Sequence, residues 1–472
     1  MRILLIQPDY PKDYRYGPKG AILFPPLGLE CIAGNITDLA DVRIFDHRVF
    51  DIEKLKREIS SYDPNYIGIS CNFSTQIYHV NALAKISKEY SNNGKIVLGG
   101  WHPTLAPDET LYSPYVDIVV RSEGELTFRE LIEKDNPKGV KGLSYKNNNK
   151  IIHNDTRKLE DLNLIKSPDR SLRIGKARKR YNFFGIPADC LETSRGCPFR
   201  CKFCNVHNFY QHKYRIKNTQ KIIKELLEIR KHSRFAYIID DNFMVFPDHI
   251  TDLCDAIIDT GLNMLFMTTA RVDMVSKHPQ IFEKMADAGF IFLFLGIESF
   301  SNKTLKNLNK QFEFKEIRNA IKILHDLGFI IQGNIILGAN YDDTVADLES
   351  TIKIAKTLDL DLPTFSLLTP YPMTELRTEV EDKGILIDRE WREYTWFKPM
   401  IKYPNLTSEQ LEHYIQKAYS ELRFFSSPMR RITRITKSRG LPYFIRRFAN
   451  FKFMKSLIPS VKNMVSRLLT GG

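Results

Sequence analysis

Residues 193–205 of this 472-residue chain read TSRGCPFRCKFCN. The three cysteines of this segment, Cys197, Cys201 and Cys204, follow one another with the spacing C-x3-C-x2-C. Thiolates that converge from one short loop are typical metal ligands. Three of them can bind three irons of a four-iron cluster and leave the fourth iron open to a substrate or cofactor. We therefore predict an iron–sulfur site with Cys197, Cys201 and Cys204 as its ligands.

A structural zinc site is the main alternative for these cysteines. His207 lies three positions past Cys204 and would complete a Cys3His ligand set. This alternative explains four ligands, but it does not explain the strand–helix units that follow. Cys190 has no partner at ligand spacing, so we predict that it lies in the core. With seven cysteines in so long a chain, a disulfide scaffold is excluded and a reducing compartment is favoured.

Residues 189–400 alternate between short apolar strands and helices. The expected strands are Leu191–Thr193, Ala236–Ile239, Met264–Thr268, Ile291–Gly296, Gln332–Leu337 and Thr364–Leu368. The expected helices between them include Gln220–Lys231. Six such units are too few for a complete eight-fold barrel, so we predict a partial (β/α)6 barrel of the TIM type.

Residues 1–136 show a similar alternation, which predicts a doubly wound parallel α/β sheet. The expected strands are Ile3–Gln7, Val42–Asp46, Tyr66–Ser70, Lys95–Gly99 and Asp117–Arg121. The expected helices are Leu27–Ile36, Ile52–Tyr62, Val80–Tyr90 and Glu125–Lys134. Ligands of such sheets bind beyond the carboxyl ends of the strands. Residues 137–188 have weaker periodicity and predict a linker, with a hairpin formed by Gly142–Tyr145 and Lys150–His153.

The basic character of the chain belongs to its last part, residues 401–472. Of the net charge of +13, twelve charges come from Lys and Arg after residue 421, where no acidic residue occurs. Aromatic and aliphatic residues accompany these charges at helical spacing, which predicts a basic, amphipathic helical region. Three interpretations stay open: peripheral contact with an anionic membrane, packing on the body of the protein, and a nucleic-acid contact, which we consider the least favoured.

The ends and apolar stretches of the chain favour a cytoplasmic protein, with or without membrane association. The first apolar run is too short for a secretory signal. No apolar stretch reaches the roughly 20 residues of a membrane-spanning helix.

In this context the cysteine segment resembles the radical S-adenosylmethionine (SAM) superfamily, whose hallmark is a C-x3-C-x2-C loop after the first barrel strand. The resemblance covers essentially the whole chain. It implies that the three cysteines bind a [4Fe–4S] cluster whose open iron binds SAM, and that Phe203 packs against the adenine. It also implies an enzyme that cleaves SAM with one electron to yield a 5′-deoxyadenosyl radical, which abstracts hydrogen from a substrate.

Segments that end the later strands also look like this superfamily. The resemblance implies SAM contacts from Asp241, Arg271, Glu298 and Ile335. Taken alone, an Asp-Asp pair is usually a solvated turn, and a single Glu after a strand is usually structural. Their recurrence at successive strand ends, on one face of the barrel, favours a shared site.

A doubly wound domain before such a barrel resembles the cobalamin-dependent branch of the superfamily, which includes the anaerobic magnesium-protoporphyrin cyclase and hopanoid- and lipid-modifying enzymes. The matching segments are 24–29, 99–104 and 121–125. The resemblance implies a cobalamin site that includes Ser70, Gly99, Gly100 and Glu123. The D-x-H-x-x-G motif of classical cobalamin proteins is absent, and His47 lies in a different context. Many members of this branch bind cobalamin without that histidine.

The combined expectation is an enzyme that uses a [4Fe–4S] cluster, SAM and cobalamin to functionalise a C–H bond of a small, apolar or lipid-like substrate. The step is a methylation or an oxidative or cyclising reaction, with an electron donor such as flavodoxin or ferredoxin. The alternatives are a non-catalytic iron–sulfur or zinc module and, less favoured, a tRNA methylthiotransferase, which would need three more cysteines in the front domain. No catalytic residue is assigned. By position alone, His207, Tyr210 and Tyr371 are candidates for a base or second hydrogen donor.

Overall fold

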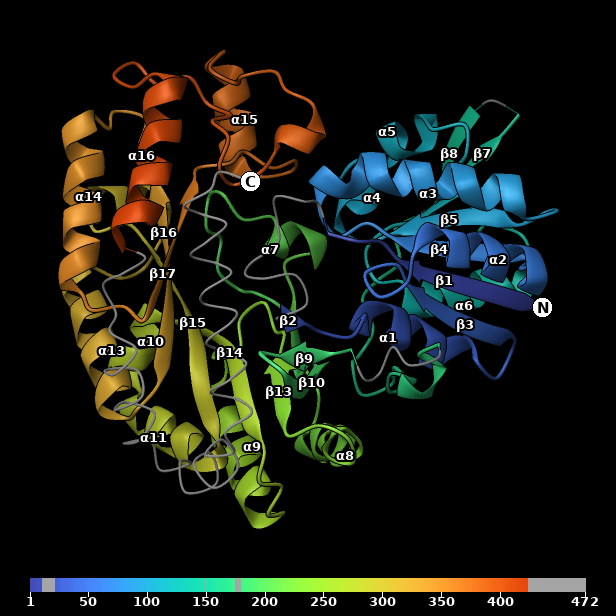
Figure 1. Ribbon diagram of the computed structural model, residues 1–472, viewed down its shortest axis with the longest axis horizontal. Helices are drawn as coiled ribbons and strands as arrows, with labels where there is room; N and C mark the ends of the chain where they lie inside the picture. The colour runs from blue at the N-terminus through green and yellow to red at the C-terminus, as the bar shows by residue number, and fades with distance from the viewer. Residues whose placement is uncertain (11–21, 149, 175–179, 423–472) are drawn as a thin grey trace. The chain divides into compact units, whose positions relative to one another are not determined.

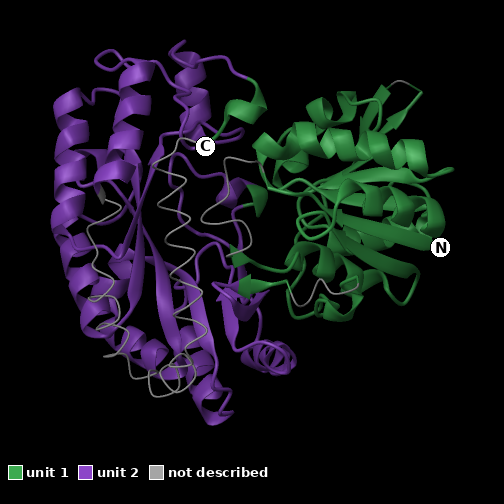
Figure 2. Cartoon of the chain, viewed as in Figure 1, with its two compact units in different colours: residues 1–182, 209–211, 390–395 green, residues 183–208, 212–389, 396–472 purple. Residues whose placement is uncertain are grey.

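The computed structural model describes residues 1–10, 22–148, 150–174 and 180–422. The basic segment 423–472, for which we predicted amphipathic helices, lies outside the described residues. The chain divides into two compact units (Figure 2). Unit 1 comprises residues 1–182, 209–211 and 390–395, and unit 2 comprises residues 183–208, 212–389 and the residues from 396 onward.

Unit 1 is built on a seven-stranded sheet with the order β3-β1-β4-β5-β6-β7-β8 (Figure 1). Its strands are β1 (Arg2–Gln7), β3 (Asp41–Asp46), β4 (Tyr66–Ser70), β5 (Lys95–Gly99), β6 (Ile118–Val120), β7 (Leu143–Asn147) and β8 (Lys150–His153). The first five are parallel, and β7 and β8 are antiparallel. Taken in chain order, the parallel strands have the order 2-1-3-4-5 of a flavodoxin-like doubly wound sheet, whose switch point lies between β1 and β4.

Both faces of this sheet are covered by helices. They are α1 (Leu27–Ile36), α2 (Ile52–Tyr62), α3 (Ile77–Tyr90), α4 (Trp101–Leu105), α5 (Pro107–Tyr112) and α6 (Glu125–Lys134). Alternate residues of β1 face opposite sides. Leu4 and Ile6 share a core with α2 and α3, and Ile3 and Leu5 share a core with α1 and α6. The predicted doubly wound sheet is therefore confirmed.

The segment predicted as a linker contributes to unit 1. The expected hairpin is β7–β8, and β7 pairs with β6 so that both strands extend the sheet. Further along, Asn35 accepts from the backbone N–H of Lys166 at 3.1 Å. A Cβ atom on Gly34 would lie 2.2 Å from the Ser167 carbonyl oxygen, so only glycine allows α1 to approach this segment so closely.

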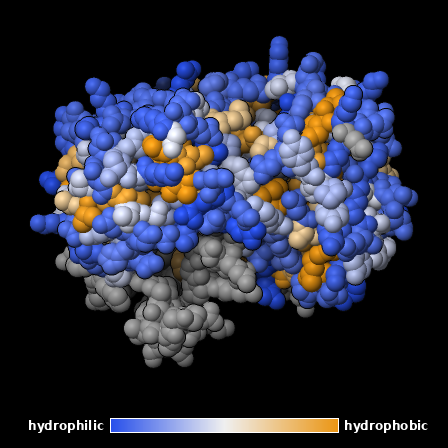
Figure 3. Space-filling model, turned by 90° about the horizontal axis from the view of Figure 1, so that it is seen from above, coloured by the Kyte–Doolittle hydropathy of each residue, from blue (hydrophilic) through white to orange (hydrophobic). Residues whose placement is uncertain are grey.

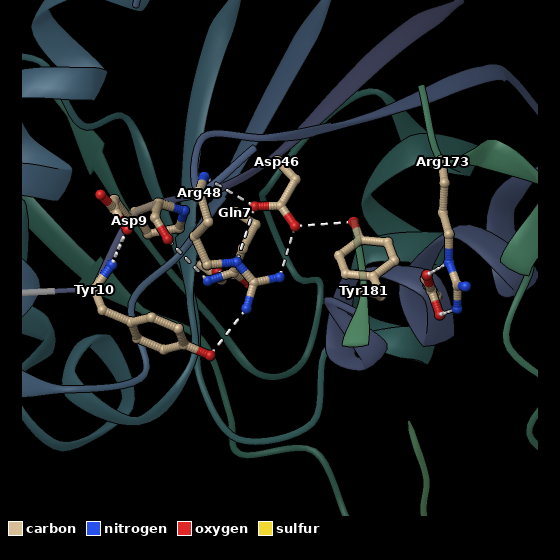
Figure 4. A network of polar contacts seen from close by, with 10 residues as sticks. Gln7, Asp9, Tyr10, Asp46, Arg48, Arg173 and Tyr181 are labelled. Carbon is tan, nitrogen blue, oxygen red and sulfur yellow. Dashed lines mark hydrogen bonds and ion pairs between the residues drawn. The ribbon is translucent and has the colours of Figure 1, made fainter. Parts of the chain in front are cut away.

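A buried polar network lies at the carboxyl end of β3 (Figure 4). Arg48 donates to both carboxylate oxygens of Asp46, at 2.9 and 2.6 Å, and to the Tyr10 hydroxyl at 2.9 Å. The Tyr181 hydroxyl donates to Asp46 at 2.9 Å. Both members of the ion pair are almost fully buried, with side chains 4% and 2% exposed. The network therefore fixes two segments that lie far apart in the sequence against the same strand.

Unit 2 contains six parallel strands in the order β10-β13-β14-β15-β16-β17. They are β10 (Ile186–Leu191), β13 (Phe235–Ile238), β14 (Leu265–Arg271), β15 (Phe290–Glu298), β16 (Ile330–Leu337) and β17 (Leu362–Leu367). The predicted partial barrel is therefore confirmed. The first strand ends at Leu191, earlier than the predicted Leu191–Thr193, because Thr193 leaves the sheet to bond the distant Asp240.

Helices cover one face of this curled sheet (Figure 1). They are α8 (Thr219–Arg230), α9 (Pro247–Asp259), α10 (Val272–Lys277), α11 (Pro279–Ala288), α12 (Asn302–Asn307), α13 (Phe314–Asp326), α14 (Val345–Thr357) and α16 (Ser408–Leu422). Helix α15 (Glu375–Asp382) instead packs in an apolar cluster with Ile336. One large core joins the helices to alternate residues of the strands. As predicted, Cys190 is buried, at 2% exposure. The other side chains of each strand point to the inner face of the half-barrel.

Among the described residues, few large apolar side chains are exposed at the surface. On the face shown in Figure 3 hydrophilic residues predominate, and hydrophobic residues form separate small areas. Single exposed apolar residues such as Tyr112 and Leu164 are ordinary for a folded protein. Within the described ranges, no helix combines the length and the apolar character needed to cross a membrane.

Candidate functional site

The cysteine loop begins just beyond the carboxyl end of β10 in unit 2. Strand β11 (Ser194–Gly196) pairs in antiparallel register with β12 (Tyr214–Ile216), so a short ribbon closes the base of the loop. Within the loop, the Cys204 N–H donates to the Cys201 carbonyl at 3.0 Å. This turn places both cysteines within one tightly bent segment.

Three consecutive residues after β13 hold the loop from one side. Asp240 accepts from the Thr193 N–H at 2.7 Å and from the Ser194 hydroxyl at 2.6 Å. Asp241 accepts from the Gly196 N–H at 3.1 Å. The side-chain amide of Asn242 donates to the Cys197 sulfur at 3.5 Å. Asp241, predicted as a SAM contact, is thus bonded to the backbone of the cysteine loop.

The segment after α12 and the start of α15 also hold the loop. The Lys202 N–H donates to the Leu308 carbonyl at 3.2 Å, and the Leu376 N–H donates to the Lys202 carbonyl at 3.0 Å. The Asn309 amide donates to the Arg200 carbonyl at 2.7 Å. The loop conformation is therefore set by the segment after β13, the segment after α12 and the start of α15.

The three thiols suit a multi-iron group. Cys201 is 8% exposed, Cys197 and Cys204 are half-buried, and all three are free thiols. Burial raises the pKa of Cys204 to about 12 and also raises that of Cys197, so the thiolates need a bound cation to form at neutral pH. Across the described ranges, no three His, Cys, Asp or Glu side chains surround a point that would hold one metal ion. A four-iron cluster does not require such convergence, because each thiolate binds a different iron.

Arg271, at the end of β14, places its guanidinium beside the loop. Its guanidinium carbon lies 3.5 Å from the centre of the Phe199 ring, and its Nε donates to Asp273 at 2.9 Å. The residue is 8% exposed, and its Nη2 has no hydrogen-bond partner among the described residues. A buried, unpartnered guanidinium N–H fits an anionic group such as the carboxylate of SAM.

Glu298 lies at a distorted point of β15. The residue has a left-handed φ of 64°, and the register with β16 shifts between Gly296 and Glu298. Its carboxylate bonds the buried Lys310 ammonium at 2.9 Å. A Cβ atom on Gly296 would lie 2.8 Å from the Glu298 Oε1, so glycine leaves room beside the carboxylate. The Lys310 ammonium also lies 5.6 Å from the centre of the Phe203 ring.

Lys310 carries its charge in this environment although burial opposes it. Burial alone would lower its pKa, but the interactions with its neighbours, of which Glu298 contributes most, outweigh this effect and raise the pKa above the usual value. The ammonium is therefore a fixed positive charge between the acidic end of β15 and the cysteine loop.

Ile335 requires a correction. We expected it to pack against adenine, but it is 1% exposed and belongs to the core between the strands and the helices. The neighbouring Ile336 instead belongs to the apolar cluster that Phe203 joins. Side chains of a strand alternate between its faces, so a shift of one residue exchanges the two positions. The structure therefore assigns Ile336, in place of Ile335, to the side of Phe203.

The residues proposed as proton or hydrogen donors do not form one group. The Nδ1 atom of His207 is buried and has no hydrogen-bond partner among the described residues. Its ring centre lies 5.4 Å from that of His212. Tyr210 belongs to unit 1, where its ring meets Trp101 edge-on at 6.1 Å. Tyr371 follows β17 in unit 2.

In unit 1, polar side chains gather at the switch point of the sheet. The Ser70 hydroxyl, at the end of β4, donates to the Gln7 side chain, at the end of β1, at 3.2 Å. The Gln76 amide donates to the Asp9 carbonyl at 3.1 Å. The Thr75 hydroxyl oxygen is buried without a partner among the described residues. This is the edge at which doubly wound sheets bind ligands.

The turn after β5 is compact and lies next to the switch point of the sheet. Gly100 has a φ of 106°, and a Cβ atom there would lie 2.7 Å from the Cys71 carbonyl oxygen. A Cβ atom on the neighbouring Gly99 would meet only Val120, at 3.7 Å. His102 is fully buried, and neither of its ring nitrogens has a partner among the described residues. Burial lowers its pKa to about 4, so the ring is neutral.

Glu123 and His47 follow the strands β6 and β3, which flank the strands of this group in the sheet. Glu123 borders a small pocket with Arg157 and Lys158. The His47 Nδ1 lies 2.9 Å from the Phe50 carbonyl, and its ring stacks on His79 at 5.4 Å. Ser70 is paired with Gly99, and the Ser122 N–H, next to Glu123, donates to the Thr104 hydroxyl, which donates to the Gly100 carbonyl.

Sequence reasoning missed Asn242 and Lys310. Asn242 stands directly after the predicted Asp241, and its position in the same strand-end motif could have indicated it. No local signal marks Lys310, because its role depends on the fold bringing it to Glu298, twelve residues earlier.

Two family models match the chain. The radical SAM superfamily matches residues 191–354, and the B12 binding domain matches residues 21–132. The first range contains the cysteine loop and the ends of β13 to β16. The second contains the switch-point residues of unit 1 that follow β4 and β5.

Individual proteins resemble the chain over most of its length. An uncharacterized methyltransferase from Pyrococcus horikoshii is 32% identical, over 91% of this chain and 93% of that protein. The anaerobic magnesium-protoporphyrin IX monomethyl ester cyclase from Rubrivivax gelatinosus is 26% identical, over 90% of this chain and 77% of that protein. A radical SAM methyltransferase from Kitasatospora setae, solved with cobalamin and a [4Fe–4S] cluster, has the same fold. Its TM-score is 0.67 at 13% identity, over 87% of this chain and 84% of that one.

Proposed function

This chain belongs to the radical SAM enzymes that carry a B12-binding domain, and from that premise we propose that it modifies a C–H bond of a small, largely apolar substrate. The proposed reaction begins with reductive cleavage of SAM to a 5′-deoxyadenosyl radical. The proposed modification is methylation, with an oxidative or cyclising step as the alternative. The Pyrococcus relative supports methylation through its name, and the Rubrivivax relative supports cyclisation.

One observation carries this proposal. Three free cysteines occupy one loop of unit 2, and the buried cationic groups of Arg271 and Lys310 lie beside that loop. A cluster bound at three thiolates leaves one iron that can bind a further ligand. The Arg271 Nη2 fits the carboxylate of SAM.

When bound, the cluster supplies an electron and an open coordination position, and cobalamin supplies a carrier for a methyl group. The chain's own residues would bind and orient these groups. Cys197, Cys201 and Cys204 would hold the cluster, while Asp240 and Asp241 fix the loop that carries them. In unit 1, the carboxyl ends of β1, β4 and β5 would hold cobalamin.

The test is anaerobic reconstitution with iron and sulfide, followed by reduction in the presence of SAM. We expect 5′-deoxyadenosine to form with the native chain and not with Cys201→Ala. Cys254→Ala is the matched control, because Cys254 is a buried core thiol away from the loop. The same preparation should retain about one hydroxocobalamin per chain. Cleavage of SAM by Cys201→Ala would refute the assignment of the cluster ligands.

We also propose a cytoplasmic location, with the reducing electron delivered by a protein such as ferredoxin or flavodoxin. The low number of cysteines and their grouping in one loop support a reducing compartment. The concentration of basic residues after residue 421 supports peripheral contact with an anionic membrane surface. Removal of residues 430–472 should shift the protein from the membrane fraction to the soluble fraction, and an unchanged distribution would contradict this contact.

A further inference from the structure

Halfway along the strands, the inner face of the half-barrel in unit 2 carries solvent-exposed residues. In β15, Leu293 and Leu295 are fully buried on the helix side, whereas Phe294 and Gly296, which alternate with them, are partly exposed. In β16, Asn334 is exposed although the strand has neighbours on both sides. The interior of a complete barrel is filled by side chains. The exposed face therefore leaves room for a ligand.

One part of this face is aromatic. The ring centres of Tyr237 and Phe294 lie 5.6 Å apart, and those of Phe294 and Phe292 lie 5.1 Å apart. Toward the amino ends of the strands, Phe183 stacks on Phe235 at 4.5 Å and meets Phe292 at 6.2 Å. These rings close the lower end of the face and form an apolar wall on β13 and β15.

The adjoining part of the face is polar. The Gln332 amide and the Thr364 hydroxyl both donate to the Asn334 Oδ1, at 3.5 and 2.5 Å. The Asn334 Nδ2 then has no hydrogen-bond partner among the described residues, and it belongs to an exposed side chain. Its N–H groups are donors that a ligand oxygen can accept.

The two walls meet where β15 and β16 pair. Phe294 is opposite Gln332, and Gly296 is opposite Asn334. Gly296 has no side chain, and the Glu298 carboxylate and the Lys310 ammonium lie beside it, 2.8 and 3.6 Å from where a Cβ atom would be. Ile336, on the side of Phe203, follows Asn334 by two residues, which is about 7 Å along a strand. The polar wall therefore begins just below the residues that surround the cysteine loop.

Among the residues that the structure describes, the charges near this region are paired. At the height of Phe294, the paired inner residues Thr269, Gln332 and Leu362 are uncharged. Above them, Arg271 is paired with Asp273, and beside Gly296 Lys310 is paired with Glu298. A charged ligand would lose its hydration here without gaining an unpaired opposite charge.

We propose that this inner face binds an uncharged substrate with a flat apolar body against Tyr237 and Phe294 and a carbonyl, ether or hydroxyl oxygen bonded to Asn334. This inference rests on the proposed function, since it names the substrate class of the same site. It also narrows that function, because a purely hydrocarbon molecule would leave the Asn334 donors without a partner.

Three probes that share one ring test the proposal. They are 6-propionyl-2-(dimethylamino)naphthalene, 2-(dimethylamino)naphthalene and 6-(dimethylamino)naphthalene-2-sulfonate. The first carries a carbonyl, the second lacks it, and the third is anionic. Their affinities are measured by anaerobic equilibrium dialysis with the cluster-loaded full chain and saturating SAM, without reductant. We expect the propionyl probe to bind about fivefold more tightly than 2-(dimethylamino)naphthalene and about tenfold more tightly than the sulfonate.

Asn334→Leu should reduce the advantage of the propionyl group to less than about twofold. Asn319→Leu, on the outer surface of helix α13, is the matched control and should preserve it. The inference is overturned if the sulfonate binds as tightly as the propionyl probe or if the advantage survives in Asn334→Leu. It is also overturned if no probe binds, because the face is then covered. Formation of 5′-deoxyadenosine by the same preparation reports on the proposed function separately.

Discussion

The side-chain amide of Asn242 donates a hydrogen bond to the sulfur of Cys197 at 3.5 Å. Asn242 is 4% exposed, so water does not easily replace this donor. Hydrogen bonds to cluster sulfurs stabilise the more negative, reduced state and so raise the reduction potential. The residue therefore positions a cluster ligand and sets part of its electronic environment.

We predict that Asn242→Leu lowers the midpoint potential of the cluster by roughly 30–60 mV, which corresponds to a hydrogen bond stronger by about 0.7–1.4 kcal/mol in the reduced state. A redox titration followed by electron paramagnetic resonance measures this shift. Asn309→Leu, which removes a bond to the loop backbone at Arg200, is the control and should leave the potential nearly unchanged. Equal potentials for Asn242→Leu and the native protein would contradict the role of Asn242.

A second prediction concerns the space beside Gly296. Gly296→Ala places a methyl group 2.8 Å from Glu298 and 3.6 Å from the Lys310 ammonium, so the ion pair must shift. We expect SAM affinity to fall about tenfold while iron content stays normal, because the cysteine loop is untouched. Equilibrium dialysis with labelled SAM gives the dissociation constant. Gly28→Ala, where the added methyl group meets nothing within 4 Å, should leave it unchanged.

Much of this architecture follows from local sequence signals. Helices such as α2 are marked by an apolar stripe and by an Asp51 cap that accepts from the Lys54 N–H, so their ends were predicted within a residue or two. The C-x3-C-x2-C spacing is also a local signal, and it predicted the cysteine loop. Contacts between distant residues could not be predicted in this way. Thr193 leaves β10 because Asp240 bonds its N–H, and that partner lies 47 residues away.

At one position the sequence also could not predict which face of a strand a side chain lies on. Ile335 and Ile336 are both apolar, so alternation between polar and apolar residues gives no signal there. Only the packing of Ile336 near Phe203 assigns the faces. The pairing of Glu298 with Lys310 likewise depends on the bulge that turns β15 at Gly296.

The buried pair of Asp46 and Arg48 predicts a large effect on the stability of unit 1. Asp46→Ala leaves the Arg48 guanidinium buried without its carboxylate, which should cost about 3–5 kcal/mol of unfolding free energy. The double variant Asp46→Ala with Arg48→Met should lose less than Asp46→Ala alone, since no charge then stays buried unpaired. Urea denaturation measures both. A double variant as unstable as Asp46→Ala would show that the charge is not the cause.

His102 predicts a pH dependence of stability. Burial lowers its folded-state pKa to about 4, from the usual 6.5, so between these values the unfolded chain binds a proton that the folded chain does not. The stability that the neutral His102 contributes is fully present above pH 6.5. It is lost as the pH falls toward 4, and the total loss is about 3 kcal/mol of unfolding free energy. Denaturation curves read from tryptophan fluorescence at several pH values measure the slope.

His102→Leu should flatten this slope between pH 6.5 and 4, because it removes the group that titrates. The exposed His413 in unit 2 supplies the control His413→Leu, which should leave the slope as it is. An unaltered slope in His102→Leu would assign the acid sensitivity to other groups.

The central claim is that three thiolates of one loop hold a cluster with an iron open to SAM. Mössbauer spectroscopy of the anaerobically reconstituted protein, with and without SAM, tests it most directly. We predict a four-iron cluster in which SAM shifts the signal of a single iron. A colourless protein loaded with zinc, or a cluster whose spectrum SAM leaves unchanged, would contradict the claim.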